Sequence, residues 1–235
     1  MLRTFRQHVI RPCEGLDGLW DFALAPDARS AKRPPTRYDR KLYVPSAWET
    51  VPGLENYRGS AWLRTWLPGG EDRAVRLVFG GVSHTADVFL DGKRVGGHYD
   101  AYTPWDVIVP PMASGGHELA VRVDNSFGKH SALHLENDYY SYGGITRPPQ
   151  LQLLPPLYID HLAATPHRAG GRWVLDVRVE LSNLSDTEQS GELVLLLDEI
   201  AFDAGEMIVP PGETWQVETT LKGLDVQPWS PAAPQ

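Results

Sequence analysis

The stretch from Asn137 to Arg147 reads Asn-Asp-Tyr-Tyr-Ser-Tyr-Gly-Gly-Ile-Thr-Arg, and it holds one carboxylate, three tyrosines, two adjacent glycines and one arginine. No helical or strand periodicity runs through it, so it is predicted to be a loop with a defined shape. Its paired glycines, Gly143 and Gly144, allow backbone conformations that other residues avoid. Its tyrosines combine a flat apolar face with a hydroxyl tip, which suits a polar ligand with apolar faces, such as a sugar.

Two interpretations of this stretch compete. In a purely structural one, Tyr139 and Tyr142 anchor the core. Arg147 then pairs with a carboxylate, and Asp138 caps a turn. The composition alone favours that interpretation. The order Asp-Tyr-Tyr-x-Tyr-Gly-Gly-Ile-x-Arg, in contrast, closely resembles the loop that closes the N-terminal sugar-binding domain of family 2 glycoside hydrolases, the β-glucuronidases and β-galactosidases.

The size and composition of the chain limit what it can be. Its 235 residues are 42% hydrophobic, which is enough to bury the core of one large or two modest domains. The 22 glycines and 20 prolines favour many turns and short strands over long helices. A net charge of -8 argues against nucleic-acid binding, which needs a basic surface.

Three features of the sequence bear on the compartment in which the protein is expected. Cys13 is the single cysteine, so no intrachain disulfide can form. The start of the chain lacks an apolar segment of signal-peptide length, and no run is long and apolar enough to cross a membrane. We therefore expect a cytoplasmic protein that does not bind membranes.

Several stretches upstream of the loop also resemble motifs of the family, and they occur in the same order. They are Leu16–Phe22, Leu42–Trp48, Tyr57–Arg64, Val82–His98 and Tyr102–Val107. Most alternate apolar and polar residues, which predicts strands with one face in a core. Asp91-Gly92 predicts a hairpin turn, because both residues tolerate positive φ angles. Each motif alone is a weak signal, and their shared order is a strong one.

Histidines near the loop raise the question of a metal site. His130 and His134 are spaced to share one face of a helix, and Glu136 follows them. No helical pattern accompanies that spacing, and the family has a loop at this place. We therefore expect no metal and no other cofactor. His98, at the end of a predicted strand, is interpreted as structural.

Pro155-Pro156 marks the predicted boundary between two domains, residues 1–155 and residues 156–235. The resemblance implies that the first is a jelly-roll sugar-binding domain. In the second, apolar residues alternate with polar ones from Trp173 to Leu181, and further short strands follow at regular spacing. That pattern predicts an immunoglobulin-like β-sandwich. The fold class expected for the chain is all-β.

The resemblance also implies a function. Retaining glycoside hydrolysis needs two carboxyl groups about 5 Å apart. In the family these are glutamates of a C-terminal (β/α) barrel, and no glutamate here lies in a matching motif. The chain stops where that barrel follows, so we expect a non-catalytic portion of a β-glycosidase that is inactive by itself, with a β-glycoside carbohydrate as the substrate of the whole enzyme.

Asp138 carries the site prediction. The aspartate at its position in the family reaches toward the barrel and helps to bind the terminal sugar, so we expect Asp138 to accept hydrogen bonds from sugar hydroxyls. Other residues are expected to hold the loop in shape: Tyr139, Tyr142, Gly143, Gly144 and Arg147. Thr146 departs from the family pattern, in which His, Phe or Tyr is common, so no contact is expected from it.

Two alternatives stay open. In the first alternative, the chain is a free-standing, lectin-like carbohydrate-binding protein. Such a protein should expose aromatic side chains on one sheet face, whereas the sequence indicates tyrosines only in one loop. In the second alternative, the chain is a structural pair of β-sandwiches that mediates assembly. The sequence identifies neither the sugar nor whether the chain forms a homo-oligomer.

Overall fold

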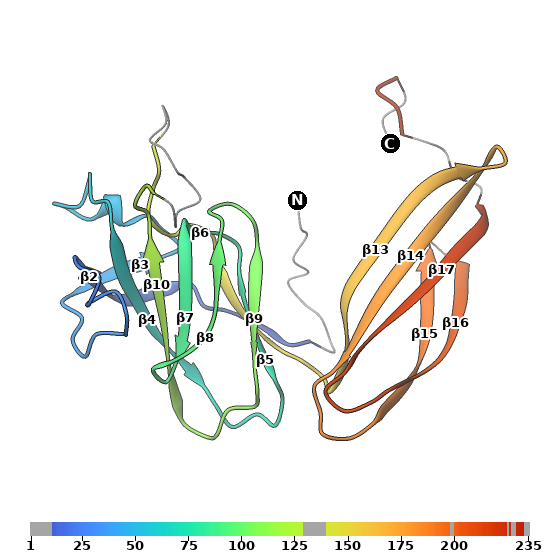
Figure 1. The fold of residues 1–235 in the computed structure, drawn as a ribbon, viewed down its shortest axis with the longest axis horizontal. Helices are drawn as coiled ribbons and strands as arrows, with labels where there is room; N and C mark the ends of the chain where they lie inside the picture. The colour runs from blue at the N-terminus through green and yellow to red at the C-terminus, as the bar shows by residue number, and fades with distance from the viewer. Residues whose placement is uncertain (1–10, 129–139, 198–199, 225, 227–228, 233–235) are drawn as a thin grey trace. The chain divides into compact units, whose positions relative to one another are not determined.

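The computed structural model describes residues 11–128, 140–197, 200–224, 226 and 229–232. The chain divides into two compact units, Met1–Leu154 and Pro155–Gln235, and both consist of antiparallel strands (Figure 1). The predicted all-β class is confirmed. Among the described residues the one helical element is a short 3-10 turn, η1 (Trp48–Thr50), and no helix has the length and apolar character needed to cross a membrane.

The first unit is a sandwich of two sheets. One sheet has the strand order β1 (Cys13–Gly15), β12 (Pro149–Leu153), β5 (Val75–Phe79) and β9 (Trp105–Val109). The other has the order β3 (Arg40–Val44), β2 (Gly18–Ala25), β4 (Ser60–Pro68), β10 (Gly116–Asp124), β7 (Thr85–Leu90) and β8 (Lys93–Tyr99). Most neighbours in each sheet are far apart in the sequence, as in a jelly roll.

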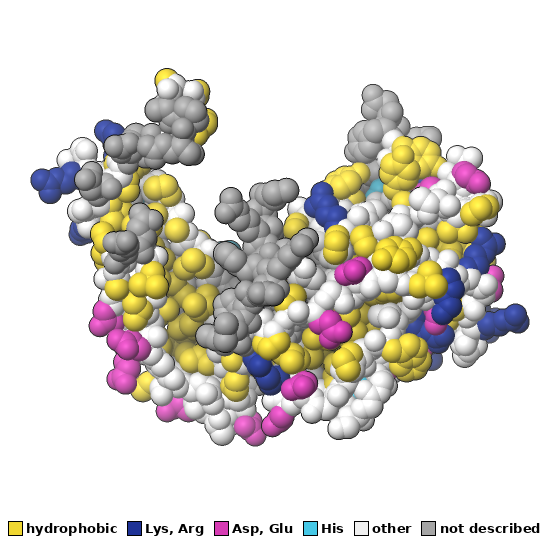
Figure 2. All heavy atoms as spheres, turned by 180° about the vertical axis from the view of Figure 1, so that it is seen from behind, with side chains coloured by type: hydrophobic (Ala, Val, Ile, Leu, Met, Phe, Trp, Pro, Cys, Tyr) yellow, Lys and Arg dark blue, Asp and Glu magenta, His cyan; other side chains and the backbone are white. Residues whose placement is uncertain are grey.

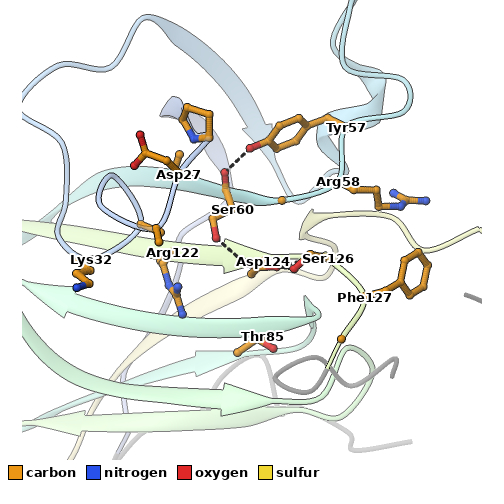
Figure 3. Close-up of a pocket in the computed structure, with 16 residues that line it drawn as sticks. Asp27, Lys32, Tyr57, Arg58, Ser60, Thr85, Arg122, Asp124, Ser126 and Phe127 are labelled. Atoms are coloured by element: carbon orange, nitrogen blue, oxygen red, sulfur yellow. Dashed lines mark hydrogen bonds between the residues drawn. The ribbon is translucent and has the colours of Figure 1, made fainter. Parts of the chain in front are cut away.

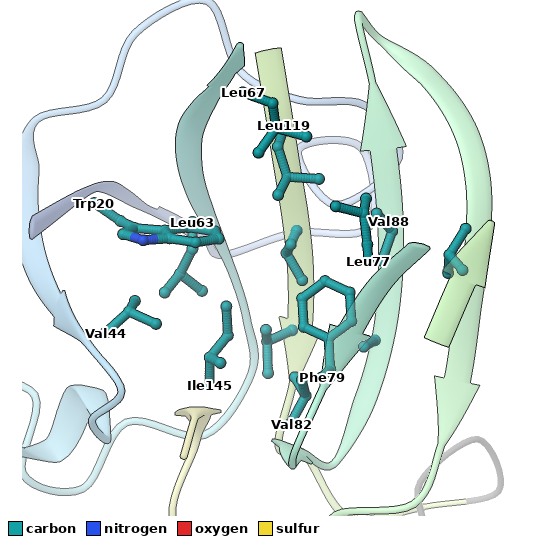
Figure 4. Close-up of a cluster of buried hydrophobic side chains, with 14 of the residues drawn as sticks. Trp20, Val44, Leu63, Leu67, Leu77, Phe79, Val82, Val88, Leu119 and Ile145 are labelled. Carbon is teal, nitrogen blue, oxygen red and sulfur yellow. The ribbon is translucent and has the colours of Figure 1, made fainter. Parts of the chain in front are cut away.

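The core of this unit lies between the two sheets. The alternation predicted for β5 is present: Arg76 and Val78 are only partly buried, whereas Leu77 and Phe79 are fully buried. Both side chains face Leu63 of β4 and Leu119 of β10 (Figure 4). Alternate residues on the strands thus bury one face of each sheet, and hydrophobic burial at about 25 cal/mol per Å2 holds the sheets together.

The outer face of the six-stranded sheet is partly covered by the segment between β2 and β3. Trp62 and Phe89 of the outer face are buried beneath Ala31 and Tyr38 of that segment. The Trp62 indole Nε1 donates a hydrogen bond to the carbonyl of Ser30 at 2.9 Å. This segment ends where β3 begins at Arg40.

The second unit is a smaller sandwich. Its three-stranded sheet contains β13 (Leu157–Ala169), β14 (Arg172–Asn183) and β17 (Thr214–Leu224), and its two-stranded sheet contains β15 (Gln189–Leu197) and β16 (Ile200–Val209). Leu193 of β15 and Val209 of β16 lie in one buried cluster with Val179 of β14 and Leu221 of β17. Hydrophobic side chains also gather on the surface of this unit (Figure 2), and Leu196 of β15 is 74% exposed.

Candidate functional site

The described part of the tyrosine loop runs from Tyr140 to Arg147 and is tied to the first unit by strand pairing. β11 (Gly144–Ile145) pairs with β6 (Val82–Ser83). On its other side, the Trp48 amide donates to the Gly143 carbonyl at 2.9 Å. The loop therefore ends as a short strand held from two sides. Asp138 and Tyr139, with His130, His134 and Glu136, lie outside the described residues.

Neither glycine of the loop leaves room for a side chain, because neighbouring residues approach its backbone closely. A Cβ atom at Gly143 would lie 2.0 Å from Cζ2 of Trp48, and the Trp48 side chain is fully buried. A Cβ atom at Gly144 would lie 2.6 Å from the Ser46 carbonyl oxygen, and Gly144 also has a φ of +132°. The pair was predicted for backbone freedom, and packing against Trp48 adds a second requirement.

A buried carboxylate, Glu49, accepts hydrogen bonds from the backbone of the loop. Its side chain is 5% exposed. The Gly143 amide donates to both of its oxygens at 3.1 Å, and Nη1 of Arg58 lies 3.2 Å from Oε1. Burial raises the pKa of Glu49, against the Gly143 hydrogen bonds and the charge of Arg58. The sequence did not identify Glu49, because its partner is 94 residues away.

Asn125 is the second buried polar residue under the loop. It follows the last residue of β10, and its side chain is fully buried. Its amide nitrogen donates to Oε1 of Glu49 at 3.2 Å and to the carbonyls of Tyr57 at 3.3 Å and Ser141 at 3.4 Å. Its amide oxygen accepts a hydrogen bond from the Gly59 amide at 3.0 Å. One side chain thus connects the end of β10 to three other segments at the base of the loop.

Two tyrosines of the loop form an exposed aromatic pair. Tyr140 is 42% exposed and Tyr142 is 52% exposed, with ring centroids 4.7 Å apart. Cζ of Arg58 lies 4.6 Å from the centroid of Tyr140, which adds a cation-π contact. The Tyr140 hydroxyl donates a hydrogen bond to the Glu55 carbonyl. The alternative in which Tyr142 anchors the core is therefore wrong.

Arg147 holds the far end of the loop through backbone carbonyls. Its Nη1 donates to the carbonyl of Tyr102 at 2.7 Å and to that of Gly80 at 3.4 Å. The Thr146 amide donates to the Gly81 carbonyl at 3.0 Å. Within the described residues Arg147 forms no ion pair with a carboxylate, in contrast to the structural alternative.

A pocket of about 680 Å3 opens beside the loop base, on the outer face of the six-stranded sheet (Figure 3). Ser60, Thr85 and Asp124, at the ends of three adjacent strands, contribute to its lining. Arg58 and Phe127 lie at one end of the group drawn in Figure 3, and Lys32 and Arg122 lie toward the other. The same Arg58 contacts Tyr140, so the pocket and the loop share a wall.

Asp124 is the carboxylate of this pocket. It accepts hydrogen bonds from the hydroxyls of Ser60 and Ser126, and from the Ser126 amide at 2.8 Å. Burial acts to raise the pKa of Asp124, but these donors outweigh burial and hold the pKa below its usual range. An ionised acceptor therefore stands among hydroxyl groups, an arrangement suited to a polyhydroxylated ligand.

Other candidate residues have structural contacts. Nε2 of His98 lies 3.0 Å from Oγ1 of Thr103, and its ring stacks on Trp105 with centroids 5.1 Å apart. Cys13 is a free thiol. In the part of the chain that the structure describes, no group of three or more His, Cys, Asp or Glu residues is placed to hold a metal ion.

Comparisons with known proteins agree with the resemblance found in the sequence. No family model matches the chain. The β-glucuronidase of Streptococcus agalactiae is 24% identical over 209 residues, which cover 78% of this chain and 32% of that protein. The β-glucuronidase of Paenibacillus borealis is 24% identical over 232 residues, which cover 83% of this chain and 37% of that protein.

Solved structures extend the similarity to the whole chain. A GH2 β-galacturonidase from Eisenbergiella tayi, bound to galacturonate, has a TM-score of 0.80 and 34% identity, over 99% of this chain and 41% of that one. A β-glucuronidase from Bacteroides uniformis has a TM-score of 0.76 at 21% identity, which shows the shared fold. The chain thus spans less than half the length of each of these proteins.

Proposed function

We propose that this chain, a relative of family 2 glycoside hydrolases in both sequence and fold, acts as the N-terminal, non-catalytic region of a β-glycosidase. The 34% identity to the GH2 β-galacturonidase over nearly the whole chain is the observation that carries the proposal. The relatives that the chain matches are β-glucuronidases, β-galactosidases and a β-galacturonidase. All of them extend well beyond the matched region, which leaves room in the whole protein for a separate catalytic domain.

In this proposal the loop of Asp138 closes one end of the substrate pocket. An enzyme that removes a terminal sugar needs a pocket with a closed end, and a loop from a neighbouring domain can supply it. Gly143, a few residues after Asp138, is fixed by Glu49 and Trp48. This role requires the Asp138 carboxylate to meet the sugar hydroxyls without a large ordering cost, and the fixed position of Gly143 supports it.

In this proposal the chain helps to bind the substrate, and a (β/α) barrel cleaves the glycosidic bond. Hydrolysis needs an acid/base and a nucleophile, and both belong to the barrel in this family. A hydrogen bond between a charged acceptor and a sugar hydroxyl contributes about 1.5–3 kcal/mol when it is shielded from water. Asp138 would therefore tune substrate affinity and the rate of catalysis without taking part in the proton transfers.

The test is the Asp138→Ala substitution in the full-length enzyme, assayed with aryl β-galacturonide, β-glucuronide and β-galactoside. We expect kcat/KM for the preferred substrate to fall about 10–100-fold, as the loss of one charge-assisted hydrogen bond predicts. Asp72→Ala, an exposed carboxylate of the same unit, is the matched control and should leave the kinetics unchanged. Wild-type kinetics in the Asp138→Ala enzyme would overturn the proposed role.

One observation favours a second candidate, a free-standing carbohydrate-binding protein. Tyr43 and Trp66 are 59% and 57% exposed on β3 and β4 of the six-stranded sheet. Tyr43 is paired with Leu19, and Arg64 is paired with Asp21, so the alternation of strands puts both aromatic residues on the outer face. The sequence indicated aromatic residues only in the loop.

The mass of the natural gene product separates the two candidates. The chain has a mass of 26.2 kDa. A much heavier product with β-glycosidase activity supports the enzyme. A product of this mass, without activity on any of the three substrates, would instead support the binding protein.

A further inference from the structure

The pocket beside the loop base has no part in the function proposed for Asp138. Its lining comes from the segment that covers the sheet, from the start of β4 and from the residues that follow β10. Its volume of about 680 Å3 falls within the range of about 300–1,000 Å3 that is usual for small-molecule sites. The described residues therefore provide a cavity large enough for a sugar.

The apolar part of the lining suits the C–H face of a pyranose ring. Ala25, Ala28 and Ala31 contribute methyl groups, and Tyr57 and Phe127 contribute aromatic rings. The Tyr57 hydroxyl donates to the Ser60 carbonyl at 2.7 Å, which fixes the orientation of its ring. Flat apolar surfaces of this kind pack against sugars without demanding hydrogen bonds from them.

The polar part of the lining suits sugar hydroxyls. Asp124 is ionised and holds two serine hydroxyls against its oxygens. Oδ2 receives one of these hydroxyls, and a carboxylate oxygen has room for a second donor. A sugar hydroxyl can supply that donor, and the two serine oxygens can accept hydrogen bonds in return.

The lining contains charged side chains of both signs. Lys32, Arg58 and Arg122 are its cationic residues, and Asp27 and Asp124 are its carboxylates. Most of these groups are already engaged. Arg58 pairs with Glu49, Arg122 pairs with Asp87, and Asp27 accepts backbone amides of its own turn.

Lys32 differs from the other charged groups of the lining. It is exposed, and among the described residues its ammonium group forms no ion pair. A ligand carboxylate near Lys32 would gain an opposite charge that no protein group competes for.

We infer that this pocket binds a sugar residue that carries one carboxylate, a hexuronic acid, at a site separate from the Asp138 loop. In the intact enzyme it would hold a second unit of an acidic glycan, a role that rests on the proposed function. Binding itself is a property of this chain and is measured without catalysis.

The experiment is a titration of the 235-residue chain with D-galacturonate, followed by 1H–15N NMR, with D-galactose as the neutral counterpart. We expect saturable shifts of the amides of Ser60, Thr85, Ser126 and Gly128, with a Kd in the range of about 1 mM. Galactose should bind about tenfold more weakly, since it lacks the carboxylate. The absence of shifts at about 50 mM galacturonate, or equal binding of both sugars, would overturn the inference.

Three variants sharpen the test. Lys32→Met should weaken galacturonate binding about tenfold and leave galactose binding unchanged, whereas Phe127→Ala should weaken both. Lys93→Met removes an exposed lysine at the start of β8, beside the end of β7 that lies opposite Thr85, and should change neither. An equal loss in Lys32→Met and Lys93→Met would reduce the effect to general charge and contradict the site.

Asp138→Ala in the same chain separates this inference from the proposed function. Galacturonate binding should be unchanged in that variant, and its loss would assign the binding to the loop and overturn a separate site. If the full-length enzyme lacked glycosidase activity while the pocket still bound galacturonate, the proposed function would fail and the pocket would stand.

Discussion

Each unit of this protein contains a buried asparagine at the end of a strand, and the two asparagines do different work. Asn125 follows β10 and is fully buried, and Asn183 ends β14 and is 1% exposed. Asn183 donates to the carbonyls of Thr187 at 2.8 Å, Val209 at 2.9 Å and Pro210 at 3.1 Å. These contacts join one turn to the end of the neighbouring strand, so Asn183 closes an end of its own sandwich.

Asn125 instead connects segments far apart in the sequence, and its network contains a charge. It binds Glu49 and Ser141, which lie 76 and 16 residues away, and Glu49 binds the loop amide of Gly143. Buried polar networks are costly unless every member is satisfied. The network of the first unit fixes the position of the tyrosine loop, whereas the contacts of Asn183 close one end of the second sandwich.

Gly143→Ala should break the first network most severely. The new Cβ would overlap the ring of Trp48, which is fully buried and cannot move aside, so we expect a loss of about 3 kcal/mol or more in the free energy of unfolding of the first unit. Urea denaturation followed by Trp fluorescence measures this loss. Gly116→Ala, where the nearest atom is 3.6 Å away, is the control and should be tolerated. A stable Gly143→Ala protein would contradict the close approach.

Asn125→Ala and Asn183→Ala test the two networks directly. Each leaves several buried groups without a partner, so each should cost its own unit about 2–3 kcal/mol. Hydrogen exchange distinguishes them, because Asn125→Ala should also speed exchange of the Gly143 amide. Faster exchange at Gly143 in Asn183→Ala would mean that the two networks are not independent.

Glu49→Gln probes the charge in the Asn125 network. Burial raises the pKa of Glu49 above its ordinary value of 4.5. Its contribution to stability is therefore fully present below pH 4.5 and is lost as the pH rises through the raised pKa. The wild type should thus lose stability relative to Glu49→Gln over that rise, and the two proteins should differ by about 1 kcal/mol or less at neutral pH.

Unfolding measured across a pH series provides the check on Glu49. The transition of the second unit is an internal control and should have the same pH dependence in both proteins. A wild-type advantage that grows with rising pH would show that the hydrogen bonds of Glu49 outweigh its burial.

The smallest effect is expected for Asp91→Asn, at an exposed contact outside both networks. Nδ1 of His117 lies 2.7 Å from Oδ2 of Asp91, and this carboxylate and the Ala113 carbonyl raise the pKa of His117. Asparagine tolerates the positive φ of this turn, so the hairpin should survive and the pKa of His117 should move back toward 6.5. NMR titration of the His117 ring measures it, and an unchanged pKa would remove Asp91 as the cause.

Much of the fold could be predicted from the sequence, because strands and turns leave a pattern in neighbouring residues. Strands with one buried face alternate apolar and polar residues, and that alternation is visible in Val75–Phe79 and in Val177–Leu181. Turn residues are also visible in the sequence. Asp91-Gly92 predicts a hairpin, and that hairpin is present between β7 and β8. The family resemblance added the order of the strands, which local patterns do not contain.

The candidate site was only partly accessible. The tyrosine loop was singled out, and its two glycines, Gly143 and Gly144, stand at positions where no Cβ fits. Asp138 remains a prediction, because it lies outside the described residues. The exposure of Tyr142 and the carbonyl contacts of Arg147 were not predicted, since neither follows from the neighbouring residues.

By itself, the sequence determined the all-β class, the strands and the kinship with family 2 glycoside hydrolases. Those properties follow from the pattern of neighbouring residues or from the order of short motifs along the chain. Only the tertiary structure identified Glu49, Asn125 and the pocket around Asp124. Hydrogen bonds and cavities form between residues brought together by the packing of two sheets, and no pattern along the chain records which distant residues will meet.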